Sequence, residues 1–265
     1  MSTTAQPRAL RRLFLDLETS PNVGLFWRAG YKLNIDSANI TTERAVICAA
    51  WKWGGDEKVY SARWDGKQND KKMLLELMKV VNSADEIVAH NGDKFDIPWL
   101  RTRLLFHGVT SFPVHKTVDT LQWARRKFYF NSNKLDYIAQ YLGLGAKLKT
   151  EFGLWKRVVL QKDKKSLADM VKYCEWDVVL LEKVYDKLAG YNAPKSHAGV
   201  LAGLEKWSCP HCGSIKVHRN VIRVSAAGTV THQMRCGRPR DGRSKHGCGR
   251  AYPISDPAYK AFLNR

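Results

Sequence analysis

The first 190 residues begin with strand-like apolar runs and continue into helical periodicities. Four runs rich in apolar residues predict strands at 11–20, 46–53, 58–64 and 86–90. The second and third flank a Gly-Gly-Asp turn at 54–56 that is typical of a hairpin. Apolar residues three and four positions apart then predict helices over 69–81, 97–106, 118–128, 133–143 and 166–190. Strands that come first and helices that dominate later indicate an α/β fold, with a mixed sheet flanked by helices.

Two parts of this region have no clear pattern. Residues 1–11 are polar and basic, and we expect them to form a disordered tail. Residues 21–44 connect the first two predicted strands and carry Phe26, Trp27 and Tyr31. A connection of this length is often functional, but these rings can equally pack on the core.

Acidic residues interrupt three of the apolar elements. Asp16 and Glu18 lie two positions apart in the first predicted strand, so their side chains share one face. Asp96 stands where a strand gives way to a helix, and Asp177 lies on the last helix, one turn after Tyr173. An unpaired anion in a protein interior is unfavourable. The four carboxylates therefore indicate a site for hard divalent cations such as Mg²⁺ or Mn²⁺.

These residues resemble the three motifs of the DnaQ-like, or DEDD, 3′–5′ exonucleases of the ribonuclease H-like superfamily. In chain order the motifs are Asp16-x-Glu18, Asn91-x-x-x-Phe95-Asp96 and Tyr173-x-x-x-Asp177. The resemblance covers about residues 11–190. It is closest to the proofreading domains of family B DNA polymerases and to stand-alone phage and bacterial exonuclease-like proteins. Tyr173 resembles the tyrosine of the DEDDy branch, whereas the other branch has a His where Lys172 stands.

The resemblance implies a ribonuclease H-like fold and a two-metal mechanism. Asp16, Glu18, Asp96 and Asp177 would hold two Mg²⁺ or Mn²⁺ ions at the scissile phosphate. One ion would activate a water for in-line attack, and the other would stabilise the departing 3′ oxygen. Tyr173 is expected only to orient that water, because a phenol with a pKa of about 10 is a poor general base near neutral pH.

Three neighbours of the motifs are weaker candidates. Asn91 matches the second motif, where its amide would fix a backbone or substrate contact. Phe95 would stack near the terminal bases of a substrate, but it can equally pack in the core. Asp119 is a candidate buried acid near the site, and we favour instead a role as the N-cap of a helix.

Four basic residues between the second and third motifs are candidate phosphate contacts. They are Arg125, Arg126, Lys147 and Lys149. Because Lys and Arg side chains are mostly exposed, any one of them is more often a solvated surface charge. Lys147 and Lys149 lie nearest the third motif and are the substrate-binding candidates.

The overall charge agrees with a nucleic-acid partner. The 265 residues include 44 Lys or Arg and 25 Asp or Glu, a net charge of +19, and the pI is near 9.8. Such an excess of positive charge favours polyphosphate binding, although ribosome-associated and membrane-surface proteins have similar charge. The sequence predicts no membrane span and no signal peptide, so we expect a cytoplasmic protein. The resemblance to phage and bacterial exonuclease-like proteins implies a bacterium or a phage-infected cell.

The last part of the chain has a different composition. Residues 196–265 contain the turn sequence CPHCG, which predicts a zinc ribbon with Cys209, Cys212, Cys236 and Cys248 as ligands of one structural Zn²⁺. The second pair is more widely spaced than usual, so His211 or His246 can replace one thiolate. A reduced cysteine cluster without metal is the rival interpretation. Cys48 and Cys174 lie in apolar segments and are expected to be buried core thiols.

The sequence thus predicts a tail at 1–11, an exonuclease domain at 12–195 and a nucleic-acid-binding zinc ribbon at 196–265. From residue 200 onward, 12 Lys or Arg stand against 3 acids, so the ribbon is expected to hold the polyanion. The predicted activity is 3′–5′ exonuclease cleavage of DNA single strands or 3′ ends, with a replication or repair polymerase as a partner in trans. The alternatives are an RNA exonuclease, a structure-specific nuclease and a non-catalytic nucleic-acid adaptor.

Overall fold

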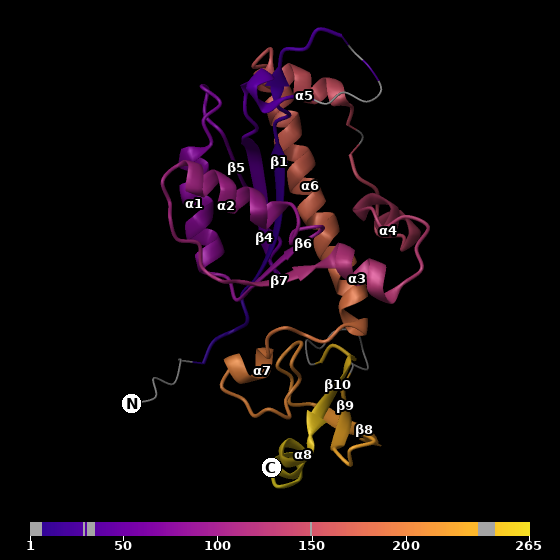
Figure 1. Ribbon diagram of the computed structural model, residues 1–265. Helices are drawn as coiled ribbons and strands as arrows, with labels where there is room; N and C mark the ends of the chain where they lie inside the picture. The colour runs from indigo at the N-terminus through magenta and orange to yellow at the C-terminus, as the bar shows by residue number, and fades with distance from the viewer. Residues whose placement is uncertain (1–6, 29, 31–34, 149, 238–246) are drawn as a thin grey trace. The chain divides into compact units, whose positions relative to one another are not determined.

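The computed structural model describes residues 7–28, 30, 35–148, 150–237 and 247–265. These residues form two compact units, one of Arg12–Tyr185 and the other mainly of Asp186–Arg265 (Figure 1). Residues 1–6 of the predicted tail lie outside the described residues. Among the helices of the described ranges, none has both the length and the apolarity needed to cross a bilayer. The domain limits at 11 and 195 stay a prediction.

A mixed sheet of five strands forms the centre of the first unit, in the order β5-β4-β1-β6-β7. Its strands are β1 (Arg12–Thr19), β4 (Val46–Trp53), β5 (Val59–Arg63), β6 (Glu86–Ala89) and β7 (Lys116–Asp119). The central strand β1 pairs antiparallel with β4 and parallel with β6. The segment between β1 and β4 contains β2 (Val23–Gly24), the short 3-10 helix η1 (Ser37–Asn39) and β3 (Ile40–Thr42). The predicted mixed sheet is confirmed.

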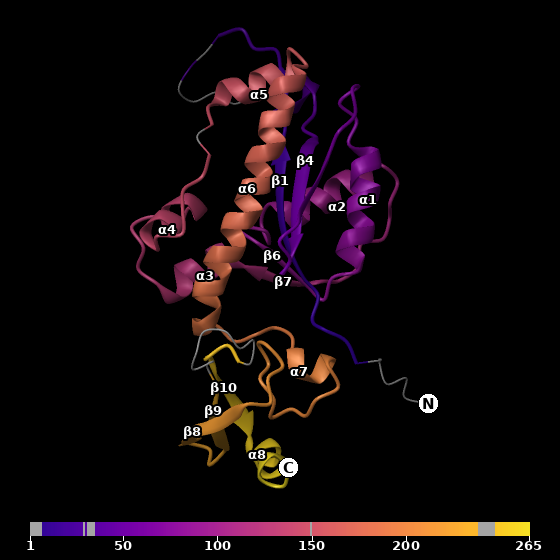
Figure 2. The same cartoon turned by 180° about the vertical axis from the view of Figure 1, so that it is seen from behind.

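Helices cover both faces of this sheet (Figures 1 and 2). They are α1 (Lys71–Asn82), α2 (Asp96–Phe106), α3 (Thr120–Lys127), α4 (Leu135–Tyr141), α5 (Phe152–Val159) and α6 (Lys164–Leu188). Successive side chains of β1 point to opposite faces of the sheet, and this alternation determines which helix each side chain contacts. Leu13, Leu15 and Leu17 are buried in a core with apolar residues of α1 and α2. Phe14 points to the opposite face and meets Tyr185 of α6 with ring centroids 5.3 Å apart. Asp16 and Glu18 share the face of Phe14, because they follow it at steps of two residues.

The prediction of one helix over 118–128 is wrong at its beginning. Residues Lys116–Asp119 form strand β7, in which Val118 pairs with Val88 of β6. Asp119 then accepts hydrogen bonds from the backbone N–H groups of Leu121 and Gln122 and caps α3. The predicted N-cap is confirmed, and it marks the boundary that periodicity alone missed.

The second unit is a small three-stranded sheet with short helices. Its strands are β8 (Val217–Val224), β9 (Val230–Cys236) and β10 (Ala251–Ser255), all antiparallel in the order β10-β9-β8. The helices are η2 (Ala189–Tyr191), α7 (Ala198–Leu201) and α8 (Asp256–Leu263). Trp207, Met234 and Tyr252 lie in its core, where the Tyr252 hydroxyl donates to the Trp207 carbonyl at 2.8 Å. This core is small, so the unit needs a further source of stability.

Asp70 connects three elements on the α1 and α2 side of the sheet. It is fully buried and accepts hydrogen bonds from Arg103 at 2.7 and 2.9 Å and from the Val46 N–H at 3.0 Å. Nε2 of His107 lies 2.6 Å from its Oδ1. Burial alone would raise the pKa of Asp70, but the hydrogen bonds from Arg103 and His107 hold it below its ordinary value. The ionised carboxylate therefore stabilises the packing of α1 against α2 and β4.

We predict that Asp70→Ala lowers the free energy of unfolding by about 3 kcal/mol, because it leaves the buried Arg103 without its partner. Urea denaturation measures this change. The matched control is Glu151→Gln, which breaks the exposed ion pair with Arg157 and should change the free energy by less than about 0.5 kcal/mol. Equal effects of the two substitutions would contradict the assigned role of Asp70.

Candidate functional site

Three carboxylates come together between β1 and α6. Oxygens of Asp16, Glu18 and Asp177 lie within 4.8 Å of one another. Asp16 and Glu18 leave β1 on the face that α6 covers, and Asp177 approaches from α6 with only 1% of its surface exposed. Residues distant in sequence thus form one acidic cluster.

The fourth predicted acid, Asp96, approaches from a third element. It is the first residue of α2, and only 2% of its surface is exposed. Burial raises the pKa of Asp96, and the backbone of Leu17, the residue between the two acids of β1, acts in the opposite direction. Asp96 lies outside the 4.8 Å group, but its charge contributes to the raised pKa of Glu18. It therefore belongs to the same electrostatic site.

Burial, together with mutual repulsion, raises the pKa values of these carboxyls. Desolvation is the largest cause, and the pKa of Asp16 rises to about 7 and that of Glu18 to about 9. Burial also raises the pKa values of Asp96 and Asp177. At neutral pH the site therefore holds protons unless cations take their place.

Lys147 supplies one positive charge to the cluster. Its ammonium group donates to Oδ2 of Asp177 and lies 3.2 Å from the Tyr173 hydroxyl. Burial would lower the pKa of Lys147, but the charge of Asp177 raises it above its ordinary value. The backbone N–H of Lys147 donates to Oδ1 of Asp136 on α4 at 2.7 Å. Lys147, which was predicted to contact phosphate, thus forms an ion pair with Asp177, which was predicted to bind metal. The position of Lys147 in the sequence does not indicate this pairing.

The cluster fits hard divalent cations. Oδ1 of Asp96 and Oδ1 of Asp177 are buried and have no hydrogen-bond partner among the described residues. The single ammonium group of Lys147 cannot neutralise four carboxylates. The atoms that these four side chains offer to a metal ion are all oxygens. This donor set suits Mg²⁺ or Mn²⁺.

The other predicted residues lie around this cluster. Burial raises the pKa of Tyr173 to about 12, so its hydroxyl stays protonated and can donate a hydrogen bond. Asn91 has a φ of 74°, and its N–H donates to Oδ1 of Asp119 at 2.9 Å. Phe95 is half-buried and meets Trp99 edge-on at 6.4 Å. Lys149 lies outside the described residues.

Cys174 touches the cluster, although the sequence indicated only a buried core thiol. Its Sγ lies 3.4 Å from both the backbone oxygen and Oδ2 of Asp16. It is fully buried, as predicted. Its position three residues before Asp177 on one helix was the available signal, because such residues share a helical face.

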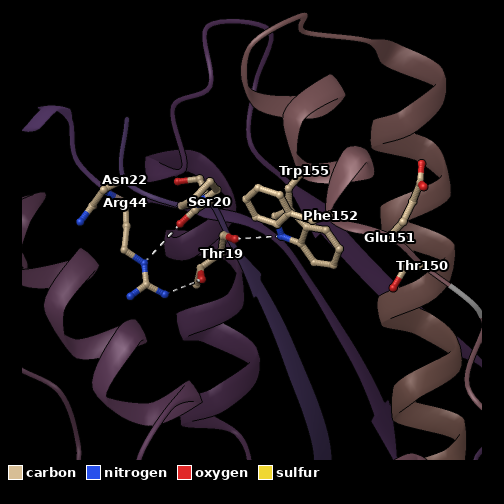
Figure 3. A pocket seen from close by; sticks show the side chains of 9 residues that line it. Thr19, Ser20, Asn22, Arg44, Thr150, Glu151, Phe152 and Trp155 are labelled. Carbon is tan, nitrogen blue, oxygen red and sulfur yellow. Dashed lines mark hydrogen bonds between the residues drawn. The ribbon is translucent and has the colours of Figure 1, made fainter. Parts of the chain in front are cut away.

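A cavity of about 550 Å³ begins one residue beyond Glu18 (Figure 3). Its lining consists of Thr19, Ser20, Pro21, Asn22, Arg44, Thr150, Glu151, Phe152 and Trp155. Trp155 donates to the Thr19 carbonyl at 3.2 Å, and Arg44 donates to Oγ1 of Thr19 at 3.2 Å. These bonds hold the end of β1 between α5 and the segment that precedes β4. The sequence did not predict α5, because its eight residues give a short periodic pattern.

Four sulfur atoms meet in the second unit. The Sγ atoms of Cys209, Cys212, Cys236 and Cys248 lie within 4.8 Å of one another. The Cys209–Cys248 and Cys212–Cys236 separations are 3.7 and 3.6 Å. A tetrahedral zinc ion with Zn–S bonds of about 2.3 Å separates its sulfurs by roughly 3.8 Å, so the cluster fits Zn²⁺. His211 lies outside this four-sulfur group, and His246 lies outside the described residues.

The backbone around the sulfurs requires glycine at two turns. Gly213 has a φ of 75°, and its N–H donates to the Cys209 carbonyl at 2.8 Å. At Gly247 a Cβ atom would lie 1.9 Å from the Gly237 carbonyl oxygen. The Cys248 N–H then donates to Sγ of Cys236 at 3.3 Å. The chain can therefore bring its two cysteine pairs together despite their unequal spacing.

Comparisons with known proteins agree with the fold. A sequence profile of the RNase H superfamily matches residues 33–189, and no curated protein sequence matches the chain. The family B DNA polymerase from the hyperthermophilic archaeon Pyrobaculum calidifontis has a similar structure, with a TM-score of 0.54 and 19% identity. The similarity covers 71% of this chain but only 26% of the polymerase, and at this identity it concerns the fold alone. The profile match begins after β1, so the placement of Asp16 and Glu18 rests on the strand geometry.

We predict that the protein without divalent cations loses stability as the pH rises. The pKa of Asp16 is raised from 3.8 to about 7, so between these values the folded state binds more protons than the unfolded state. The free energy of unfolding therefore falls from about pH 5 to pH 8. Asp16→Asn removes this titration and should raise Tm at pH 8 by roughly 3 °C, measured by scanning calorimetry.

Added Mn²⁺ should reverse this loss at pH 8, because a ligand of the folded state raises Tm. Asp16→Asn should abolish the response to Mn²⁺. The control Asp93→Asn changes an exposed acid three residues before Asp96 and should behave as the wild type. A wild-type Tm at pH 8 that does not respond to Mn²⁺ would refute the cation site.

Proposed function

The chain belongs to the RNase H superfamily, and we propose that within it the protein is a metal-dependent 3′–5′ exonuclease of the DEDDy type that acts on DNA. The observation that supports this proposal is the close group of Asp16, Glu18 and Asp177 with Asp96 beside it. Membership of the superfamily supports nuclease activity in general. The acids and Tyr173 support the exonuclease in particular.

The four acids would hold two Mg²⁺ or Mn²⁺ ions. When bound, these ions would supply Lewis acidity and an activated water. The chain's own residues have separate tasks. Tyr173 keeps its proton because its pKa is about 12, so it donates a hydrogen bond and orients the nucleophile. Lys147, which contacts Asp177 and lies 3.2 Å from Tyr173, is placed to donate to a phosphate oxygen at the same point.

The cavity next to Glu18 would receive the 3′-terminal nucleoside. Its volume of about 550 Å³ suits a small ligand, and Phe152 and Trp155 contribute aromatic rings. Arg44 supplies a positive charge on its other side (Figure 3). A terminal residue held here would place its phosphodiester bond near the acids. We favour DNA because one of the similar solved structures is a DNA polymerase.

The second unit would act as a zinc ribbon that binds nucleic-acid backbone. The four sulfurs have the spacing of a tetrahedral thiolate site. Strand β8 carries Arg219 and Arg223 on an exposed stretch of sequence. Its cations would hold the polyanion, since Lys and Arg contacts with phosphate give affinity without sequence preference.

Cleavage of 5′-labelled DNA tests the exonuclease. With Mg²⁺ or Mn²⁺ the wild type should give a ladder of products shortened from the 3′ end. Asp16→Ala and Asp177→Ala should each lower the rate at least about 100-fold, because even outer-shell changes at metal sites cost about 10- to 100-fold. The matched control Asp93→Ala should retain the wild-type rate, since Asp93 is exposed.

The same assay with labelled RNA and with duplex DNA separates the alternatives. Faster cleavage of RNA would replace the DNA assignment with an RNA exonuclease. Cleavage that persists in Asp16→Ala and Asp177→Ala would refute the metal site. If the wild type cuts no substrate, the chain is a nucleic-acid adaptor and the proposed activity is wrong.

Zinc content tests the second unit separately. We predict one Zn²⁺ per chain by mass spectrometry of the purified protein, and Cys212→Ser should lose the ion because three thiolates bind it less tightly. The control Cys48→Ala removes a buried cysteine of the first unit and should retain zinc. A protein that contains no zinc after growth in zinc-supplemented medium would leave the reduced cysteine cluster as the correct interpretation.

A further inference from the structure

Aromatic rings form a contiguous strip where α3 ends and α4 runs. Phe128 and Phe130 stack with centroids 5.4 Å apart, and Phe130 meets Tyr141 edge-on at 5.5 Å. Tyr141 in turn stacks with Tyr137 at 6.2 Å. We call these four residues, together with Tyr129, the aromatic strip. The strip lies outside the acidic cluster and the cavity near Glu18.

Two rings of the aromatic strip face solvent. Tyr129 is fully exposed, with a relative exposure of 107%, and Tyr141 is 67% exposed. The backbone at Phe128 is extended, with φ of −139° and ψ of 158°. Phe128 and Phe130 pack against each other, and Tyr129, which lies between them in the sequence, is left exposed. The packed rings support a surface that presents free aromatic faces.

The segment of sequence that carries the aromatic strip is rich in positive charge. Residues 120–149 contain a single acid and six Lys or Arg, which are Arg125, Arg126, Lys127, Lys134, Lys147 and Lys149. The acid, Asp136, accepts the backbone N–H of Lys147. Arg125, Arg126 and Lys127 are all exposed on the last turn of α3, directly before the first ring. Such a combination is typical of surfaces that bind single-stranded nucleic acid, where cations contact the phosphates and aromatic rings stack on the bases.

Hydrogen bonds connect the aromatic strip to the acids at two places. Helix α4 carries Tyr137 and Tyr141, and its Asp136 holds the loop whose Lys147 contacts Asp177. Trp176, the neighbour of Asp177, donates to the Ala146 carbonyl in the same loop at 2.7 Å. At the other end, α3 begins at Asp119, which accepts the N–H of Asn91 in the second motif. The aromatic strip is thus fixed within the same unit as the acidic cluster.

We propose that the aromatic strip binds single-stranded nucleic acid on the 5′ side of the nucleotide that is cleaved. The inference rests on the proposed function, since it takes the 3′ end to lie at the acids. Tyr129 and Tyr141 stack on unpaired bases, while the cations of α3 contact the phosphates between them. Bases inside a duplex already stack on one another and offer no free faces. The strip therefore selects single strands over duplex.

Binding in the absence of cleavage tests this surface. The full chain with Asp16→Ala is titrated, without added Mg²⁺ or Mn²⁺, into a labelled oligo-dT of roughly 20 nucleotides and into a blunt duplex. Tyr129→Ala and Tyr141→Ala should each raise the oligo-dT Kd about 5-fold or more by fluorescence anisotropy. Tyr129→Phe should leave the Kd unchanged, because it keeps the ring. The control Phe106→Ala removes a 70% exposed ring from α2 and should also have no effect.

Two results would overturn the inference. The first is an oligo-dT Kd that Tyr129→Ala and Tyr141→Ala leave unchanged, and the second is an equal loss of affinity for the duplex. The exonuclease proposal is judged separately, from cleavage by the chain with its native Asp16. A native chain that cuts DNA while the tyrosine variants bind normally refutes the strip alone. A native chain that cuts nothing while these variants bind weakly refutes the nuclease and retains a single-strand binding surface.

Discussion

Repulsion among closely spaced carboxylates is the constraint on which the first unit depends. Four acids lie where desolvation raises their pKa values, and Lys147 pairs with only one of them. If all four carboxylates were ionised and no cation were bound, their repulsion would destabilise the fold. Protonation relieves the repulsion at low pH, and bound divalent cations would relieve it at higher pH. The stability of the unit and the proposed metal binding would therefore depend on one electrostatic arrangement.

Because successive side chains of β1 point to opposite faces of the sheet, the acidic cluster and the hydrophobic core that stabilises the unit lie on different faces. Leu13, Leu15 and Leu17 contribute to the core with α1 and α2, while Asp16 and Glu18 face α6. A shift of one residue in the strand would exchange the two sets of side chains. Asp70 lies on the core side and is fully paired, so its pKa is lowered where those of the cluster are raised. Burial alone does not set the charge of an acid in this protein, because the available partners decide the outcome.

The sequence predicted the long elements and the acidic side chains that they bring together, because both depend on local spacing. The two-residue step in β1 and the four-residue step in α6 are enough to indicate the faces of Asp16, Glu18 and Asp177. Strand β7 and helix α5 were missed, since they are short and owe their conformation to tertiary pairing. The contact of Lys147 with Asp177 joins residues 30 positions apart, and that of Cys174 with Asp16 joins residues 158 positions apart. Local sequence patterns cannot predict contacts over such separations.

The acids proposed to bind metal would also repel the phosphates of a nucleic-acid substrate, so affinity for that substrate would have to come from other parts of the chain. Positive charge is accordingly concentrated in other segments of the sequence, namely at the end of α3 and in the residues after 200. Rings at the end of α3 add a contribution that salt does not screen, because stacking does not depend on net charge. The two kinds of contact have different consequences. Phosphate contacts hold any polyanion, whereas stacking requires unpaired bases, so the aromatic strip can select the strand that reaches the acids while the cations determine how tightly the chain is held.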